Sequence, residues 1–232
     1  MTITPNSGAE FLVQELGLVD YKETWDLQKE LFNKLIEAKA RGERGKMYLL
    51  LLEHPHVYTM GMHGNVNNLL FNEDFLNRIG AKYYKIERGG DVTYHGYGQL
   101  VGYPIFDLEE LGLGIKKYMW ALEEAIIMTI AEYGITATRM DGAVGVWIDA
   151  QTSHARKIAA LGVKASRFVT MHGFALNVTT DLSYFNHINP CGFVDKGVTS
   201  IEKETGLKPT LKEVGEKFTH HLRSILFTTE HI

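Results

Sequence analysis

The sequence has little cysteine and little proline: its 232 residues include one cysteine and five prolines. A single thiol cannot form an internal disulfide, so a small secreted fold held by disulfides is excluded and a reducing compartment is favoured. No proline-rich linker, low-complexity segment or internal repeat divides the chain, and single domains of roughly 200–250 residues are common. We therefore expect one domain over residues 1–232.

Long apolar runs and a strong net charge are also absent. The longest apolar run, residues 47–52, has six residues, far fewer than the roughly 18 needed to cross a bilayer. No basic residue precedes Lys22, and no apolar stretch followed by a small-residue cleavage site is present, so we expect no secretory signal. The net charge of −4 gives no general attraction to nucleic acid or to an anionic membrane. We expect a cytoplasmic protein that binds neither.

Hydrophobic patterning predicts both helices and strands. Helices are expected where apolar residues recur at helical intervals, at about 20–40, 115–133 and 210–226, the first and last behind a capping box. Strands are expected at 47–53, 81–87, 100–106, 143–148, 157–163 and 167–178, the last three as an antiparallel meander. The strand at 47–53 is apolar almost throughout and should be buried on both faces. The fold class is α+β.

Glycine is concentrated in residues 88–102. Four glycines in residues 88–99 make regular secondary structure improbable there. The same segment contains Arg88, Thr93, His95 and Gln99, which can donate hydrogen bonds to a ligand that approaches the glycine backbone closely. The alternative is a solvated connection without function. Neither the dinucleotide fingerprint nor the phosphate-binding loop is present, so nucleotide binding is not supported.

The single thiol, Cys191, lies between Pro190 and Gly192, in a turn-like setting that can present sulfur at a surface. The alternative is a buried, inert thiol. A nucleophilic thiolate, from a usual pKa of about 8.5, requires a neighbouring cation, a histidine or a helix N-terminus. The candidates are His95, His172, Lys157 and Lys164.

Lys157 is the most interesting of these candidates because it opens an apolar run that extends to Val163. Partial burial would lower the pKa of its ammonium group and let it share a proton with a thiol. The alternative is a lysine at a strand edge with its ammonium in water.

A metal site is not expected. His54 and His56 flank a proline, but no Cys-x-x-Cys or His-Glu-x-x-His spacing accompanies them.

Five sequence blocks, taken together and in order, resemble the octanoyltransferases of lipoate biosynthesis, which belong to the wider group of biotin and lipoate protein ligases and transferases. The blocks are residues 54–61, 88–99, 157–162, 172–177 and 190–192. The resemblance extends from Leu16 to about Leu211. It implies a single catalytic domain with a mixed, largely antiparallel sheet packed by helices.

The resemblance also implies a two-step acyl transfer. An octanoyl group would pass from octanoyl-acyl carrier protein to Cys191, and then to a specific lysine of an apo lipoyl domain. The implied acceptors are the lipoyl domains of 2-oxoacid dehydrogenase E2 subunits and the H protein of glycine cleavage. Lys157 matches the family lysine that lowers the pKa of the thiol. The reaction would need no ATP, cofactor or metal.

The substrate-binding stretches of the family fall on residues that suit an acyl chain, which needs apolar walls and donors to its carbonyl oxygen. They are Arg88, Gly89, Gly90, Asp91, Val92, Thr93, Tyr94, His95, Ala160, Leu161, Gly162, Gly173, Phe174 and Ala175. The sequence departs from the family at Tyr97, where proline is usual, and in residues 148–154, which resemble a lengthened hairpin.

There are two alternatives to octanoyl transfer through a cysteine. An ATP-dependent lipoate or biotin protein ligase of the same fold would activate a free acid and need no cysteine, and a non-catalytic protein could merely bind an acyl carrier or a lipoyl domain. Cys191 together with Lys157 argues against both. Since acyl carrier protein is usually acidic, a local basic surface is expected. Its candidates are Arg41, Arg44 and Lys46, or Arg156, Lys164 and Arg167.

Overall fold

The computed structural model describes residues 9–189 and 196–227. Cys191, the proposed acyl carrier, lies outside the described residues. None of the described helices combines the length and the apolar character that crossing a membrane requires.

The main sheet is mixed and largely antiparallel, as expected. Its order is β1 (Phe11–Leu18), β2 (Met47–Glu53), β6 (Gln99–Ile105), β10 (Val169–Asn177), β9 (Arg156–Ser166), β8 (Ala143–Ile148) and β7 (Thr138–Met140). Only β1 and β2 are parallel along this path, and the short β11 (Gly197–Val198) adds a parallel pair to β9. A second sheet has the order β4 (Lys82–Lys85), β3 (Val57–Met60) and β5 (Val92–His95).

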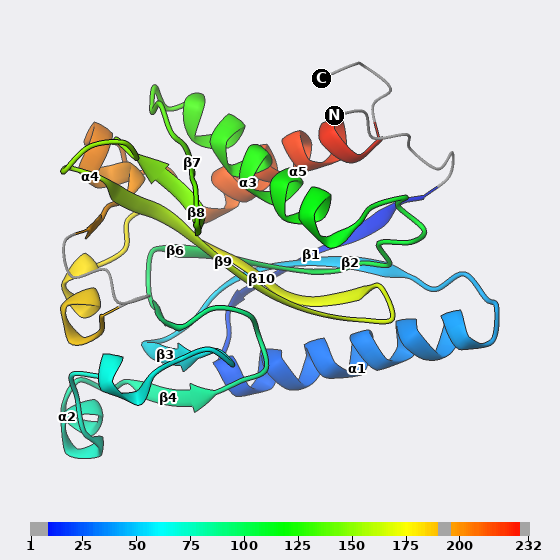
Figure 1. Cartoon of the computed structure of the whole chain (residues 1–232), viewed down its shortest axis with the longest axis horizontal. Coiled ribbons are helices and arrows are strands. Elements are labelled where there is room, and N and C mark those ends of the chain that lie inside the picture. The colour runs from blue at the N-terminus through cyan, green and yellow to red at the C-terminus, as the bar shows by residue number, and fades with distance from the viewer. Residues whose placement is uncertain (1–8, 190–195, 228–232) are drawn as a thin grey trace.

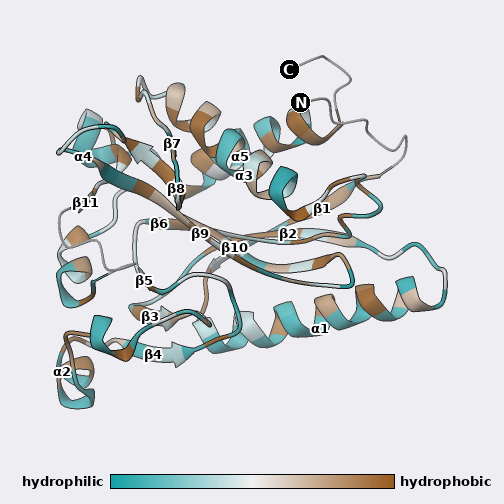
Figure 2. Ribbon diagram, in the orientation of Figure 1, coloured by the Kyte–Doolittle hydropathy of each residue, from teal (hydrophilic) through white to brown (hydrophobic). Residues whose placement is uncertain are grey.

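Helices cover both faces of the main sheet (Figure 1). α3 (Ile115–Ala131) and α5 (Leu211–Phe227) lie together on one face, and α1 (Tyr21–Ala40) lies on the other, beside the second sheet. The short helices are α2 (Glu73–Arg78) and α4 (Ile201–Thr205), with 3₁₀ turns at Val66–Asn68 and Leu182–His187. Figure 2 shows hydrophobic and hydrophilic residues alternating along α1, the pattern of a helix with one buried face.

The long helices begin where their caps predict. The Asp20 carboxylate accepts a hydrogen bond from the Lys22 amide at 2.8 Å at the start of α1. The Thr210 hydroxyl accepts one from the Glu213 amide at 3.1 Å at the start of α5. α3 ends at Ala131, two residues before the predicted end, and the chain turns at Gly134 with φ of 78°. The three predicted helices are confirmed.

β2 is buried on both faces, which confirms the prediction from its apolar sequence. Leu49 and Leu51 pack in the main core, which also contains the buried faces of α3 and α5. Leu50 and Leu52 point the other way and pack with Tyr103 in a separate cluster. Alternate residues of one strand thus fill two cores, which requires every position to be apolar.

The expectation that residues 88–99 lack regular structure is wrong for β5. Val92 to His95 pair antiparallel with β3, because this glycine-free tetrapeptide is rich in β-branched and aromatic side chains. The predicted strand at 81–87 is also shorter, covering only β4, and it pairs with β3 rather than with the main sheet. The sequence patterns did not reveal β1, β3, β7, β11, α2 or α4.

The antiparallel meander of β8, β9 and β10 is confirmed. Residues 149–155 connect β8 to β9, so this segment is a hairpin connection. Arg156 anchors its end by two hydrogen bonds of 2.6 Å to the Glu204 carboxylate and by an ion pair with Asp149. This hairpin places Lys157 at the start of β9.

Candidate active site

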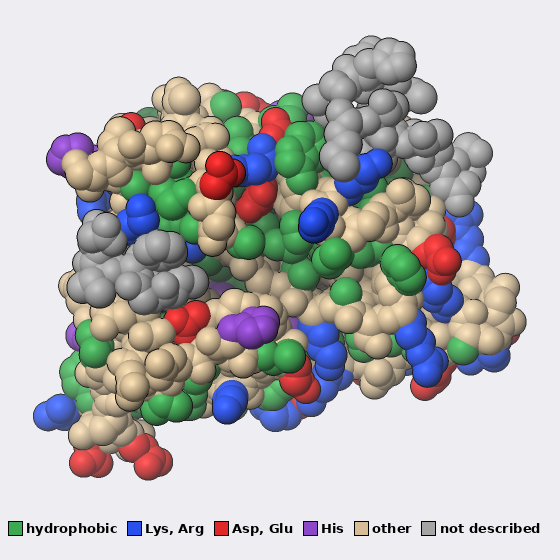
Figure 3. All heavy atoms as spheres, viewed as in Figure 1, with side chains coloured by type: hydrophobic (Ala, Val, Ile, Leu, Met, Phe, Trp, Pro, Cys, Tyr) green, Lys and Arg blue, Asp and Glu red, His purple; other side chains and the backbone are tan. Residues whose placement is uncertain are grey.

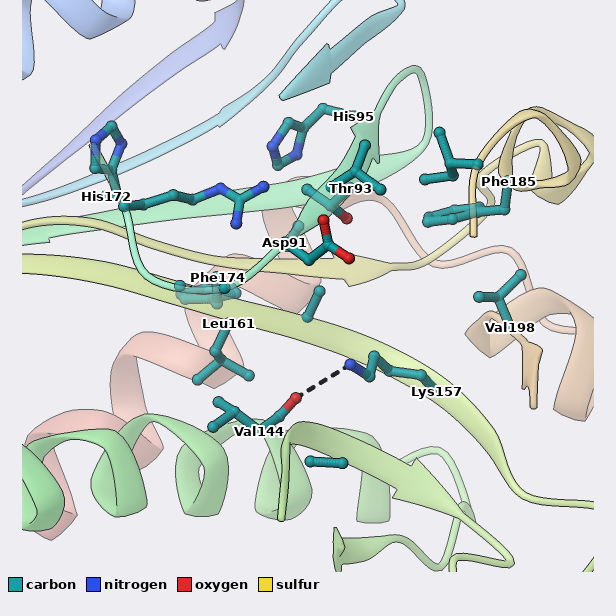
Figure 4. A pocket seen from close by; sticks show the side chains of 18 of the residues that line it. Asp91, Thr93, His95, Val144, Lys157, Leu161, His172, Phe174, Phe185 and Val198 are labelled. Atoms are coloured by element: carbon teal, nitrogen blue, oxygen red, sulfur yellow. Dashed lines mark hydrogen bonds between the residues drawn. The ribbon is translucent and has the colours of Figure 1, made fainter. Parts of the chain in front are cut away.

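A pocket of about 530 Å³ opens between the main sheet and the second sheet. In the space-filling view, hydrophobic side chains gather across the middle of the face where the surface is hollowed (Figure 3). The walls come from the β5 strand and its preceding loop, from β8, β9 and β10, and from the chain on either side of residues 190–195. Figure 4 shows Leu161 and Phe174 facing this space from neighbouring strands.

Both described residues that flank the 190–195 segment line the pocket. They are Asn189, after the Leu182–His187 turn, and Lys196, just before β11. The chain therefore lies at the pocket both immediately before and immediately after this segment.

Lys157 lies on the pocket wall and its ammonium group is oriented by two neighbours on β8. Its Nζ donates a hydrogen bond to the Val144 carbonyl at 3.1 Å (Figure 4) and lies 4.6 Å from the centroid of the Trp147 ring. A cation over an aromatic face is stabilised by the ring quadrupole. β9 lies between β10 and β8, so Lys157 is not on an edge strand.

Arg88 holds the glycine loop against the second sheet. Its buried guanidinium donates to the Thr59 carbonyl at 2.8 Å, to the Thr59 hydroxyl at 3.1 Å and to the Gly89 carbonyl at 2.9 Å. The Gly89 amide in turn donates to the Val163 carbonyl of β9 at 2.9 Å. These bonds fix the loop that forms one wall of the pocket.

Asp91 presents a carboxylate at the pocket (Figure 4). It accepts hydrogen bonds from the Asn65 amide at 3.2 Å and from the Asn68 side-chain amide at 2.5 Å. The segment after β3 therefore sets the position of this side chain.

The protonation state of His95 follows from its neighbours. The Gln99 side-chain amide donates to the Tyr94 carbonyl at 3.1 Å and to Asn177 Oδ1 at 2.9 Å, so its oxygen must face His95 Nδ1, 2.9 Å away. Nδ1 therefore carries the proton and Nε2, 3.5 Å from the Thr59 hydroxyl, does not. Burial, followed by the proximity of other histidines and Arg88, places the pKa of His95 well below its usual value. The ring is neutral at pH 7.

His172 is buried, with 1% of its surface exposed, and has a φ of 60°. Its backbone amide donates to Gln28 Oε1 at 2.9 Å, and neither ring nitrogen has a hydrogen-bond partner among the described residues. Burial lowers the pKa of His172 to about 3. Neither candidate histidine therefore offers a positive charge to a thiol near neutral pH.

Most of the expected substrate-binding residues meet at the pocket. Those that line it are Arg88, Gly90, Asp91, Val92, Thr93, His95, Ala160, Leu161, Gly162, Gly173, Phe174 and Ala175. Gly89 and Tyr94 do not. Gly89 supports the loop from behind, and the Tyr94 hydroxyl bonds to His56 Nδ1 at 2.7 Å within the second-sheet core.

Several lining residues were missed by sequence reasoning. They include Tyr21, Tyr103, Val144, Trp147, Phe185 and Val198. They come from elements that are remote in sequence and belong to none of the five blocks, so no local pattern could have identified them.

The other candidate cations lie elsewhere. Lys164 does not line the pocket, and its Nζ lies 4.0 Å from Glu87. Arg41 and Arg44 belong to one of the two groups expected to form a basic surface. Arg41 is paired with Glu43, and Arg44 is paired with Glu110.

His54 and His56 do not share a site. His54 contacts the Val19 carbonyl at 2.7 Å and the Tyr103 hydroxyl at 2.9 Å, whereas His56 contacts the hydroxyls of Tyr94 and Tyr184. Within residues 9–189 and 196–227, no group of three or more histidine, cysteine, aspartate or glutamate residues is placed to hold a metal ion.

Some known proteins are similar to this chain in sequence, and others are similar to it in fold. An octanoyltransferase of Bacteroides fragilis is 52% identical over 211 residues, which cover 91% of this chain and 96% of the relative. An octanoyltransferase of Flavobacterium psychrophilum is 52% identical over 224 residues, covering 94% and 97%. A bipartite lipoate protein ligase from an archaeal lipoylation system of Thermoplasma acidophilum has the same fold, with a TM-score of 0.68, 17% identity and coverage of 94% of this chain and 84% of that chain.

The family model described as "Lipoyl protein ligase A/B catalytic domain" matches residues 20–223. These residues include all five sequence blocks and every residue named above as lining the pocket. The chain belongs to the lipoyl protein ligase A/B catalytic domain family, in which the two relatives described here are octanoyltransferases.

Proposed function

We propose that this chain is an octanoyltransferase of protein lipoylation, with Cys191 as acyl carrier and Lys157 as the residue that activates it. Curated relatives at about 50% identity carry that activity in their name. The observation that carries the proposal is the pocket itself. It joins Lys157, an apolar wall, and Asn189 and Lys196, the described residues on either side of the segment that contains Cys191.

In the first step, the Cys191 thiolate attacks the carbonyl carbon of the octanoyl thioester on acyl carrier protein. A new carbon–sulfur bond forms, the bond to the carrier sulfur breaks, and the departing thiolate takes up the proton that Cys191 gave up. Lys157, held between the Val144 carbonyl and the Trp147 ring, is the group that stabilises the thiolate and relays this proton. Exchange of one thioester for another is nearly neutral in energy, so no ATP is required.

In the second step, the ε-amine of a lysine on an apo lipoyl domain attacks the Cys191 thioester. A carbon–nitrogen bond forms, the carbon–sulfur bond breaks, and Cys191 returns as a thiolate that accepts the proton released from the amine. Because an amide is more stable than a thioester, this step drives the transfer forward.

The pocket suits a medium acyl chain. Its apolar wall includes Val92, Ala160, Leu161 and Phe174, and the loop held by Arg88 closes it on the side of the second sheet. An apolar wall with a few fixed polar groups binds such a chain by burial and orients its reactive end.

The partners and location belong to the same proposal. The donor is octanoyl-acyl carrier protein, and the acceptors are lipoyl domains of 2-oxoacid dehydrogenase E2 subunits and the H protein of glycine cleavage. We place the reaction in the cytoplasm and the whole activity in one domain; the family match over residues 20–223 supports the latter.

The test is to incubate the protein with octanoylated acyl carrier protein, without ATP, and to record intact-protein mass. We expect one octanoyl mass on Cys191, absent in a Cys191→Ser variant, and discharge of the adduct on addition of an apo lipoyl domain. An ATP-dependent ligase is not favoured by the relatives. Absence of the adduct, with transfer supported instead by ATP and free octanoate, would overturn the proposal in favour of that ligase.

A further inference from the structure

One peptide group of β8 lies between two charged side chains. Its carbonyl, from Val144, accepts a hydrogen bond from Lys157 Nζ at 3.1 Å. Its N–H, from Gly145, donates to Glu123 Oε1 at 3.0 Å. Since the peptide group is planar and trans, these two bonds leave from opposite edges of a single rigid unit.

Glu123 reaches this peptide from α3 and is 8% exposed. Its second oxygen accepts a hydrogen bond from Arg139 Nε at 3.1 Å, and Arg139 also binds Glu124 at 2.7 Å and the Trp120 carbonyl at 2.9 Å. Burial raises the pKa of the Glu123 carboxyl, while the Gly145 amide, Arg139 and Lys157 oppose that effect. A buried carboxylate is costly unless it is bonded in this way.

The backbone at Gly145 allows the close approach. Its φ is +133°, a conformation that side chains rarely adopt, and an added Cβ would lie 2.7 Å from the Ala159 carbonyl oxygen and 3.1 Å from Lys157 Cε. The Lys157 side chain therefore crosses β8 over a position with no side chain of its own. The hydrogen bond from the Gly145 N–H to the Glu123 carboxylate holds the backbone in this conformation.

We propose that Glu123 is a positioning residue for Lys157, acting through the Val144–Gly145 peptide; this inference rests on the proposed function of Lys157. The carboxylate orients the peptide so that its carbonyl faces the lysine. A negative charge at the N–H edge also polarises the peptide and strengthens the carbonyl as an acceptor for an ammonium group. The arrangement favours the charged form of Lys157.

A test must distinguish the effect of Glu123 on Lys157 from the effects of the other charged groups nearby. Arg88 and Asp91, from the loop before β5, and Lys196, just before β11, line the same pocket. Arg139 binds Oε2 of Glu123 at 3.1 Å, whereas the Gly145 amide binds Oε1. The neighbouring Glu124 is a matched control, because it shares Arg139 with Glu123, whereas the Gly145 amide bonds to Glu123.

The experiment measures the pKa of Lys157 directly, in the full chain without substrate. Lysines are methylated reductively with ¹³C, and the Lys157 signal is identified by its loss in a Lys157→Arg variant. In Glu123→Gln, we expect the pKa of Lys157 to fall by about one unit because a nearby negative charge is removed. In Glu124→Gln, we expect a change of no more than a few tenths of a unit. Equal shifts in both variants, or none in Glu123→Gln, would overturn the proposal.

A second variant covers the case in which Glu123→Gln does not fold. Glu123→Asp keeps the charge beside Arg139 but withdraws the carboxylate from the Gly145 amide by about one methylene. We expect the pKa of Lys157 to fall here too, and an unchanged value would contradict the peptide link.

Catalysis supplies an independent measurement. Glu123→Gln should slow octanoyl transfer to Cys191 about 10-fold at neutral pH, comparable with weakening one hydrogen bond to a charged group, and should move the pH profile of Cys191 alkylation to higher pH. Failure of the parent protein to form an octanoyl adduct would remove the proposed function while leaving the Lys157 titration interpretable. An unshifted titration with normal adduct formation would remove only the role of Glu123.

Discussion

The Gln99 side-chain amide donates a hydrogen bond to Asn177 Oδ1 at 2.9 Å, joining two residues that are 78 positions apart in the sequence. Gln99 also fixes the tautomer of His95, and Asn177 donates to the Thr199 carbonyl at 2.9 Å. The Thr199 amide then bonds to the Lys157 carbonyl at 3.0 Å. A continuous buried chain of hydrogen bonds thus connects the β5–β6 turn to the strand that carries Lys157.

Asn177→Ala should break this chain. The variant leaves the Thr199 carbonyl without its donor and removes one acceptor of Gln99, so we expect a loss of about 2–3 kcal/mol in the free energy of unfolding, measured by urea denaturation. Asn67→Ala, at an exposed position, should change it by no more than about 0.5 kcal/mol. Similar losses in the two variants would mean that this series of hydrogen bonds adds nothing to the free energy of unfolding.

Lys157→Ala should make the only thiol of the protein less reactive at neutral pH. Removing the cation raises the pKa of Cys191, so alkylation by iodoacetamide should slow about 10-fold at neutral pH and recover partly as the pH rises. Lys164→Ala, which removes a lysine outside the pocket, should retain the parent profile. A parent-like profile in Lys157→Ala would show that the lysine does not activate the thiol.

Gly145→Ala should disturb catalysis as well as stability. The new methyl group would meet the Ala159 carbonyl and the Lys157 side chain, so the ammonium group must move. Gly134→Ala provides the control, since Gly134 also has a positive φ but an added Cβ there meets nothing within 4 Å. We expect Gly134→Ala to lose about 1 kcal/mol of stability from backbone strain, and Gly145→Ala to lose more because its Cβ also meets a backbone oxygen. Only Gly145→Ala should lose about 10-fold or more in octanoyl transfer rate. Equal rates would contradict this account.

Leu161→Phe should shift the acyl-chain preference toward shorter chains. Leu161 and Phe174 are paired across β9 and β10 on the pocket wall, and a larger side chain takes up space that the chain end would occupy. Octanoyl transfer should fall about 10-fold relative to butanoyl transfer, measured with the two acyl carrier thioesters. Leu12→Phe, on an exposed position of β1, should leave the ratio unchanged. An unchanged ratio in Leu161→Phe would place the chain elsewhere.

Stability should decrease as the pH falls below about 6.5, before most carboxylates titrate. Burial lowers the pKa of His54 to about 4 and of His172 to about 3 in the folded protein, whereas an unfolded histidine has a pKa of about 6.5. The unfolded chain therefore binds more protons in this range, and each histidine should cost about 2 kcal/mol between pH 6.5 and pH 5.

Urea denaturation at the two pH values measures this slope. His172→Phe should remove the contribution of one histidine, and because the ring nitrogens of His172 have no partner among the described residues, the change breaks no ring hydrogen bond seen there. His220→Ala, at an exposed position, should retain the full slope. A slope that is the same in His172→Phe as in the parent would contradict the burial of an uncharged ring.

The predictable parts of the fold are those specified by neighbouring residues. α1 and α5 were predicted because a capping residue and a repeating apolar face lie within each segment. β2 was predicted because its continuous apolar sequence suits burial on two sides. β5 was missed because four surrounding glycines conceal a short strand whose formation depends on pairing with β3.

The reactive residue types, their order in five blocks and the family to which they point can all be read from the sequence. Tertiary structure decided which of them meet: Lys157 faces the pocket with Val144 and Trp147, whereas Tyr94 and Lys164 do not line it. It also decided that Glu123 bonds to the peptide that receives Lys157. The physical reason is that periodicity and caps act over a few residues, whereas these contacts depend on how α3 packs on β8 and how β8, β9 and β10 align.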